Sequence, residues 1–234
     1  MLTIALDTST PIGSIALGRC SARAVEEDIQ RQLPTQAVRS ESVLPEIDRL
    51  LQAAGMRPSQ ISRIVVGSGP GSFTGVRISA ALAKGMRAAL RAELHAWSSL
   101  AAIAVASGGD GRVCAAIDAR RGQVYAAGYE IEREGTELVR LRSFFGPVAE
   151  RFEMTLGRLR PIGAWTLSGD LPEPLDRAAE RADIRRMPPS SGESAASALL
   201  RLAGSFPASG RIMNPEAWEP DYVRASSAER EAER

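Results

Sequence analysis

The chain has 234 residues, 44% of them hydrophobic, which is enough apolar material for one large domain or two small ones. Its 29 basic residues against 28 acidic ones leave a formal charge of +1, which excludes a broad positive surface for nucleic acid; any contact with RNA must be local or made through a partner. The N-terminus lacks the pattern of a signal segment, and no stretch approaches the roughly 18 apolar residues of a membrane span, so we expect a cytoplasmic protein without membrane contact.

The N-terminal part of the chain predicts a hairpin, a helix and a strand that leads into a loop. Alternating apolar residues predict the hairpin over residues 2–17, and apolar residues at helical spacing predict a helix over 44–54. A short buried strand over 61–66 precedes a glycine-rich loop over 67–74, and a second helix extends to about residue 91. This order of strand, glycine loop and helix is typical of α/β proteins.

A second hairpin is predicted over residues 112–127. Its first strand ends in Asp118, as the first strand of the chain ends in Asp7, and a short polar turn with a glycine follows in both. This similarity predicts an internal duplication, with an N-terminal lobe over residues 1–106 and a smaller one over 107–225. The predicted fold class is therefore α/β, with two lobes of the duplicated ribonuclease-H-like, actin-like type and mixed sheets flanked by helices.

The rest of the chain predicts fewer elements. Residues 135–189 indicate only a strand-like piece over 164–167 and a charged helix near 175–182. A helix near 194–204 is a candidate to pack back on the first lobe. Residues 226–234 are charged and lack apolar anchors, which predicts a disordered tail.

The glycine-rich loop has two interpretations. Backbone N–H groups at a helix start can hold a phosphate, and Asp7-Thr8-Ser9 resembles the acidic and hydroxyl cluster with which actin-like ATPases hold magnesium and phosphate. However, no lysine follows Gly75 as a P-loop requires, and Thr74 stands where a dinucleotide fingerprint needs glycine. The alternative is a tight turn whose Ser72 or Thr74 caps the next helix. The candidate residues of a vestigial nucleotide site are Asp7, Thr8, Ser9, Gly69 and Gly71.

The helix after the loop has more apolar surface than one side of a sheet would cover. Its four basic residues, at 77, 84, 87 and 91, form one narrow stripe, and small or apolar residues cover most of the remaining circumference. We expect such a helix to pack under the second lobe or to form a subunit interface, with an ordinary core helix as the alternative. The candidate interface residues are Val76, Ser79, Ala80, Leu82, Ala83, Met86 and Leu90.

Few residues of the types used in catalysis or metal binding are present. Cys20 and Cys114 belong to no CxxC pair and predict neither a zinc site nor a disulfide. His95 is the single histidine and Lys84 the single lysine, so a paired-histidine metal site is excluded. No nucleophile elbow or reactive cysteine context accompanies His95. We therefore predict no metal site and no catalytic residue, with catalysis by His95 as the weaker alternative.

Four segments in the same order resemble the TsaB family, also called YeaZ. The second and third segments are the specific ones, and together the four extend over nearly the whole chain. They are Ile4-Ala5-Leu6-Asp7-Thr8-Ser9-Thr10, Gly69-Pro70-Gly71-Ser72-Phe73-Thr74-Gly75-Val76-Arg77-Ile78, Ala116-Ile117-Asp118-Ala119-Arg120-Arg121-Gly122-Gln123-Val124-Tyr125 and Glu219-Pro220-Asp221-Tyr222-Val223-Arg224. Family members often carry histidine where this chain has Arg39, which leaves any role of that histidine in doubt here.

The resemblance implies a non-catalytic subunit that serves the modification of tRNA. In that family, TsaD places the threonylcarbamoyl group on the adenosine beside the anticodon of tRNAs that read codons beginning with A. The resemblance implies TsaD and the ATPase TsaE as partners, a homodimer when the subunit is alone, and tRNA contact through the complex. It implies no cofactor of its own, since the partner subunits use ATP, although weak nucleotide binding stays open.

Two other functions stay open. A nucleotide-dependent phosphotransferase or ATPase of the actin-like superfamily would use Asp7 and the loop from Gly69. A metallopeptidase is the weakest alternative, because the chain has a single histidine.

Overall fold

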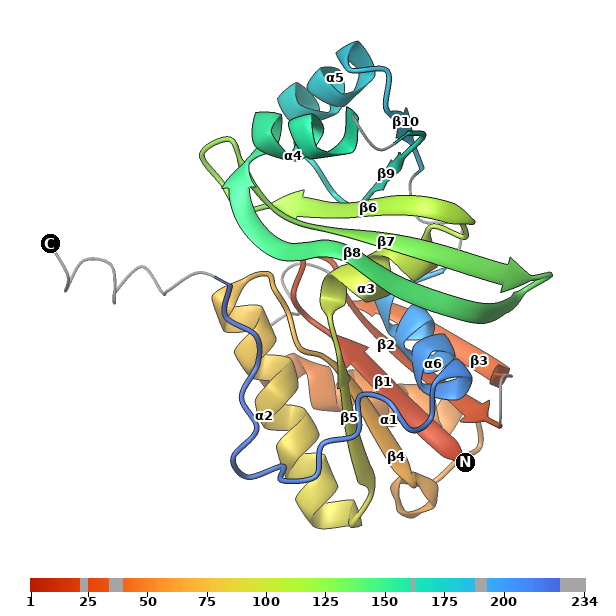
Figure 1. The fold of residues 1–234 in the computed structure, drawn as a ribbon. Helices are drawn as coiled ribbons and strands as arrows, with labels where there is room; N and C mark the ends of the chain where they lie inside the picture. Colours follow the sequence, from red (N-terminus) through yellow and green to blue (C-terminus); the bar gives the residue numbers. More distant parts are fainter. Residues whose placement is uncertain (22–24, 34–39, 161–162, 188–192, 224–234) are drawn as a thin grey trace, which may run out of the picture.

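The computed structural model describes residues 1–21, 25–33, 40–160, 163–187 and 193–223. Two five-stranded sheets dominate the structure, with helices between them and on their outer faces (Figure 1). None of the helices in these ranges is both long and apolar enough to cross a membrane. The tail predicted over residues 226–234 lies outside the described residues.

The first sheet, sheet A, is built from the N-terminal hairpin and the strands on either side of the glycine-rich loop. Its strands are β1 (Leu2–Asp7), β2 (Gly13–Cys20), β3 (Val25–Leu33), β4 (Arg63–Gly67) and β5 (Glu93–Trp97). They lie in the order β3-β2-β1-β4-β5, in which β1, β2 and β3 are antiparallel neighbours and β4 and β5 run parallel to β1. The sheet is therefore mixed, as predicted.

The second sheet, sheet B, repeats this arrangement. Its strands are β6 (Gly111–Asp118), β7 (Gln123–Glu134), β8 (Glu137–Arg151), β9 (Thr166–Ser168) and β10 (Arg185–Arg186). Their order is β10-β9-β6-β7-β8, again with three antiparallel neighbours followed by two parallel ones. The duplication predicted from the two hairpins is confirmed, because both sheets have the same strand order and the same strand directions.

Helices and sheets alternate in five layers (Figure 1). The helices of the described ranges are α1 (Ser40–Ala53), the short 3-10 helix η2 (Pro58–Gln60), α2 (Phe73–Leu90), α3 (Ser99–Ala106), α4 (Phe152–Leu159), α5 (Glu173–Arg181) and α6 (Ala195–Ser205). α1 and α2 cover the outer face of sheet A, α4 and α5 cover the outer face of sheet B, and α3 and α6 lie between the sheets. The pleat of β1 accounts for this, since Ile4 points into the outer core and Ala5 into the core between the sheets.

Of the two helices that lie between the sheets, α3 is buried at all eight of its residues. We expected this environment for α2, as one of two alternatives, and that alternative is wrong: the second lobe packs on α3 and α6, and α2 keeps one face on the outside of the molecule. α6 follows sheet B in the sequence yet contacts β1 and β2 of sheet A. We propose to divide the chain into lobes between Ala106 and Ser107.

Candidate functional site

The glycine-rich loop joins β4 to α2 and packs tightly against the turn of the first hairpin. Ser72 is the N-cap of α2, and its hydroxyl accepts a hydrogen bond from the Gly75 N–H (3.3 Å). A Cβ on Gly71 or Gly75 would approach the backbone of the hairpin turn closer than the 3.0 Å that real Cβ atoms keep. The glycines therefore allow two segments of protein backbone to meet, and the capped-turn interpretation accounts for this part of the loop.

Asp7 lies beneath the loop and is 1% exposed. One carboxylate oxygen accepts hydrogen bonds from the backbone N–H (2.8 Å) and the hydroxyl (2.6 Å) of Ser9, and the other accepts one from the Ser99 hydroxyl (2.6 Å). Burial raises the pKa of Asp7 above its ordinary value, although these hydrogen bonds lower it in part. Both carboxylate oxygens of Asp7 thus accept hydrogen bonds from within the protein.

Thr8 and Ser9 also form hydrogen bonds within the protein. The Thr8 hydroxyl donates to the Gly75 carbonyl (2.6 Å), and the Ser9 carbonyl accepts from the Ser72 N–H (2.7 Å). At the other end of the loop, the Ser99 N–H donates to the carbonyl of Gly69 (2.8 Å), whose φ of +94° favours glycine. The predicted residues do come together, but as a network that ties the hairpin turn, the loop and the start of α3 to one another.

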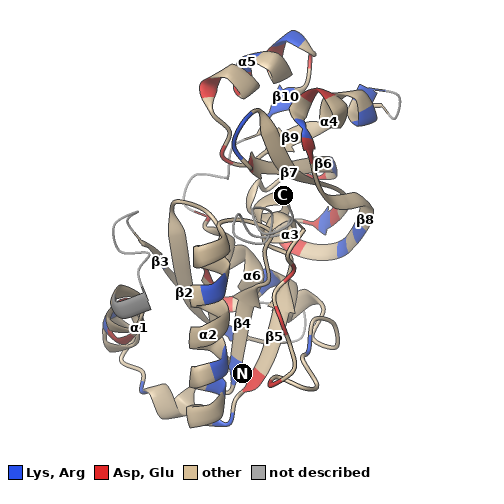
Figure 2. Ribbon diagram, turned by 90° about the vertical axis from the view of Figure 1, so that its left-hand side faces the viewer, with Lys and Arg blue, Asp and Glu red and all other residues tan. Residues whose placement is uncertain are grey.

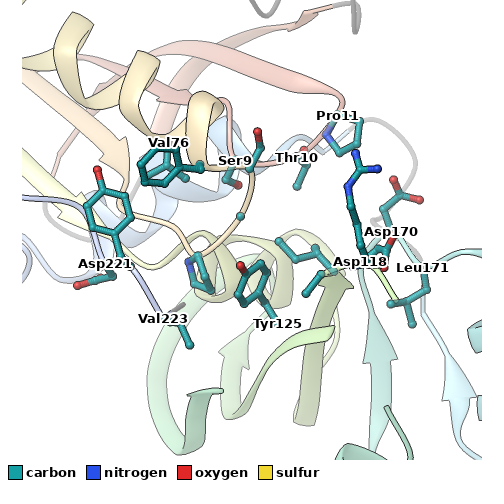
Figure 3. Close-up of a pocket in the computed structure, with 18 of the residues that line it drawn as sticks. Ser9, Thr10, Pro11, Val76, Asp118, Tyr125, Asp170, Leu171, Asp221 and Val223 are labelled. Atoms are coloured by element: carbon teal, nitrogen blue, oxygen red, sulfur yellow. Dashed lines mark hydrogen bonds between the residues drawn. The ribbon is translucent and has the colours of Figure 1, made fainter. Parts of the chain in front are cut away.

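A cleft of about 490 Å³ opens beside this network, between the two lobes (Figure 3). Of the five predicted nucleotide-site residues, Ser9 and Gly71 line it, whereas Asp7, Thr8 and Gly69 are not among its lining residues. The second lobe contributes residues from the end of β6, from the turn after it, from the start of β7 and from the loop between β9 and α5. They are Ile117, Asp118, Ala119, Arg120, Tyr125, Asp170, Leu171 and Pro172.

The charges of the cleft do not favour a polyphosphate. Asp118, Asp170 and Asp221 contribute three carboxylates to its described lining, against the one guanidinium of Arg120. The Asp118 carboxylate accepts the backbone N–H of Arg120 (2.7 Å) and that of Asp221 accepts the Ser68 hydroxyl (2.7 Å). Lys84 lies on α2 and donates instead to the Glu216 carbonyl (3.3 Å). A triphosphate placed here would meet more negative charge than positive.

His95 is fully buried on β5. Its Nδ1 lies 3.3 Å from the Ser209 carbonyl oxygen and its Nε2 lies 3.4 Å from a Glu93 carboxylate oxygen. Burial, with the positive charge of Arg63 as a second cause, lowers the pKa of His95. Within the ranges that the structure describes, no three or more His, Cys, Asp or Glu side chains gather as a metal site would require.

The side of α2 that faces outward does not carry the predicted interface residues. Four of the seven are buried within the same chain, and the other three are half-buried and pack against the core of sheet A: these are Val76, Ser79, Ala80 and Ala83, then Leu82, Met86 and Leu90. The exposed residues of α2 are Thr74, Arg77 and four small ones. We call three of the small ones, Ala81, Gly85 and Ala88, the docking face because their spacing of four and three places them on one side of the helix. Figure 2 shows α2 at the surface of the first lobe.

Comparison with known proteins gives one family model and several relatives. The model described as TsaD, tRNA N6-adenosine threonylcarbamoyltransferase, matches residues 26–161. The tRNA threonylcarbamoyladenosine biosynthesis protein TsaB of Escherichia coli is 31% identical over 240 residues, covering 97% of this chain and 96% of that protein. TsaB of Bacillus subtilis is 40% identical over 134 residues, a match that spans 56% of each chain.

Two solved structures are similar to nearly the whole chain. YeaZ from Pseudomonas aeruginosa has 28% identical residues and a TM-score of 0.72, covering 95% of this chain and 100% of that one. A second structure, of a protein with similarity to the peptidase YeaZ from the same organism, has 29% identity and a TM-score of 0.74 and covers 95% and 99% of the two chains.

Proposed function

The chain belongs to the TsaB family of tRNA threonylcarbamoyladenosine biosynthesis proteins, and from this premise we propose that it is a non-catalytic subunit that binds and activates TsaD. Its place in the biosynthesis of tRNA threonylcarbamoyladenosine follows from the relatives that carry that name. We propose TsaE as a further partner, a homodimer when the subunit is alone, and contact with tRNA through the complex.

The hydrogen bonds of the predicted nucleotide-site residues support the proposal that the subunit is non-catalytic. The Asp7 carboxylate, which an actin-like ATPase would turn toward a bound magnesium ion, accepts three hydrogen bonds from Ser9 and Ser99. Ligand binding would have to break these bonds inside a buried site, where unsatisfied polar groups are costly. The residues therefore stabilise the fold in the place where a catalyst would bind substrate.

The docking face supports the proposal that the chain binds TsaD. Small residues let a second helix approach closely, and the same outer layer contains α1, on which Leu44 is 48% exposed. Small helical residues, with an exposed leucine on the neighbouring helix, can be covered by the apolar face of a partner helix. The single observation that carries the proposal is this outward face of α2 on a chain of the TsaB family.

Reconstitution tests the proposal directly. We expect TsaD, TsaE, the enzyme that forms threonylcarbamoyl-adenylate, ATP, threonine, bicarbonate and tRNA to yield modified tRNA only when this chain is added. The modified nucleoside can be measured by mass spectrometry of digested tRNA. Full modification without the chain would overturn the proposal.

The presence of the cleft favours a second candidate, a nucleotide-dependent phosphotransferase or ATPase. The cleft lining is acidic, and both carboxylate oxygens of Asp7 already accept hydrogen bonds from the protein. We therefore expect calorimetry of the isolated protein with Mg-ATP to show no saturable binding at micromolar concentrations. Micromolar binding that Asp7→Asn removes would instead support the phosphotransferase. A peptidase assay with and without chelator tests the remaining alternative.

A further inference from the structure

Arg77 lies on the side of α2 that faces outward, one turn before the docking face. It precedes Ala81 by four residues, so helical spacing places it in line with Ala81, Gly85 and Ala88. The structure describes every residue of α2, and Arg77 is the one charged residue among those that are exposed. A partner that covers the docking face therefore meets a positive charge at the N-terminal end of that face.

The Arg77 side chain is held in place by two aromatic rings. Its guanidinium carbon lies 3.8 Å from the centre of the Phe73 ring and 5.7 Å from that of the Tyr222 ring. Its Nε donates a hydrogen bond to the Tyr222 hydroxyl (3.2 Å). Among the described residues, none accepts a hydrogen bond from the two terminal amino groups of this guanidinium. These groups are therefore available to an acceptor outside the chain.

The residues that hold Arg77 are themselves fixed. The Asp221 N–H donates to the Ser68 carbonyl (2.9 Å), and the Asp221 carboxylate accepts a hydrogen bond from the Ser68 hydroxyl (2.7 Å), which anchors the segment that carries Tyr222. The Tyr222 ring lies 5.4 Å from the ring of Phe73, the first residue of α2. The guanidinium is thus oriented before any partner binds, so binding costs less side-chain entropy than it would for a free arginine.

The charge of Arg77 is not neutralised within the part of the chain that the structure describes, because no carboxylate there forms an ion pair with it. Lys84, further along α2, differs: it lies 3.6 Å from the Glu219 carboxylate and donates to the Glu216 carbonyl (3.3 Å). The planar guanidinium matches the two oxygens of a carboxylate, and arginine is frequent among the residues that dominate protein interfaces.

The neighbouring charges favour a carboxylate of a protein over the phosphates of a nucleic acid. The two rings that hold Arg77 also line the cleft, and three carboxylates share that lining: Asp118, Asp170 and Asp221. An RNA strand carries a phosphate at every nucleotide, so it would bring several negative charges toward these carboxylates. A single carboxylate on a helix that follows the docking face would meet Arg77 without that repulsion.

We propose that Arg77 recognises a carboxylate of TsaD and thereby selects a partner helix with an acidic residue at this end of the docking face. The inference rests on the proposed function, since it concerns the partner named there. Each terminal amino group of Arg77 donates to one oxygen of that carboxylate. A partner helix with a neutral or basic residue at this position would leave the guanidinium covered but unpaired, which weakens binding.

Calorimetric titration of TsaD into the full-length chain, at about 50 mM and about 300 mM salt, tests the inference. Arg77→Met keeps a long side chain against Phe73 and removes the charge. We expect its Kd at low salt to rise about tenfold or more, and to depend less on salt than that of the unsubstituted chain. Arg77→Lys keeps the charge without the planar pair of donors and should give an intermediate Kd. Thermal melting of the isolated variants should change little, because Arg77 is exposed.

Arg160→Met is the matched control. Arg160 is exposed at the C-terminal end of α4 in the second lobe. This variant should bind TsaD with the Kd and the salt dependence of the unsubstituted chain. A double-mutant cycle then identifies the carboxylate. Among TsaD variants that each have one exposed Asp or Glu replaced by Ala, one should bind Arg77→Met and the unsubstituted chain equally well.

The possible failures of the inference and of the proposed function are distinguishable. Equal Kd values and equal salt dependence for Arg77→Met and the unsubstituted chain would overturn the inference and leave the docking of TsaD intact. An Arg77→Met chain that binds TsaD normally, in a complex that retains less tRNA, would also overturn it by assigning Arg77 to a phosphate. If TsaD did not bind the unsubstituted chain, the proposed function would fail, and the inference with it.

Discussion

Replacing Gly85 with glutamate is expected to weaken the binding of TsaD by roughly a hundredfold while the protein stays folded. A Cβ at Gly85 meets nothing within 4 Å, and glutamate is the better helix former by about 0.5–1 kcal/mol, so the isolated chain should lose no stability. In the docked complex the same carboxylate would be buried without a partner, which costs about 3 kcal/mol or more. This corresponds to a loss of roughly a hundredfold in affinity.

Gly157→Glu is the matched control. Gly157 lies in helix α4 of the second lobe, it is exposed, and a Cβ there also meets nothing within 4 Å. Calorimetric titration of TsaD into each variant, with thermal melting of the isolated chains, separates binding from folding. Equal affinities for the Gly85→Glu, Gly157→Glu and unsubstituted chains would show that TsaD binds elsewhere.

Replacing Ala83 with glutamate, two residues earlier on the same helix, is expected to unfold the protein. Ala83 is 0% exposed and belongs to the core between α2 and sheet A. An unpaired carboxylate there costs several kcal/mol, which is a large part of the about 5–15 kcal/mol that stabilises a typical domain. Denaturant unfolding of the isolated chain should show this loss without any partner.

Ala88→Glu provides the comparison for this second substitution, because Ala88 is exposed on the same helix. We expect its unfolding midpoint to stay close to that of the unsubstituted chain. An Ala83→Glu chain that unfolds normally yet fails to bind TsaD would restore Ala83 to the interface and contradict the packing described above.

The parts of the fold with regular patterns were predictable from the sequence. The two hairpins share an apolar first strand that ends in Asp7 or Asp118, and this similarity predicted the duplication that the strand orders confirm. The family predicted from the four segments is confirmed by the relatives named TsaB and YeaZ.

Elements without a periodic pattern were missed. β3 lies at the edge of sheet A and exposes most of its described side chains, so its residues do not alternate as a half-buried strand would. α3 is apolar on every side, and a run of eight such residues has no helical period to detect. β8 is also an edge strand, and irregularities interrupt its register with β7.

The sequence identified the segments that form the candidate site, but it did not show which way the side chains of α2 point. Helical spacing shows that Ala80 and Ala83 share a face, but small residues suit a buried contact within the chain as well as one between chains. Ser99 completes the hydrogen bonds of Asp7 from 92 positions away, so no local pattern identifies it. The interface itself stays a prediction, now placed on Ala81, Gly85 and Ala88.

The position of α6 has a consequence for synthesis of the chain on the ribosome. α6 ends at Ser205 yet covers β1 and β2, which are translated long before it. Until residue 205 has left the ribosome, the apolar inner face of sheet A is incomplete and open to aggregation or chaperone binding. Contacts between segments this far apart also slow folding. The first lobe to be translated is therefore among the last parts to reach its final form.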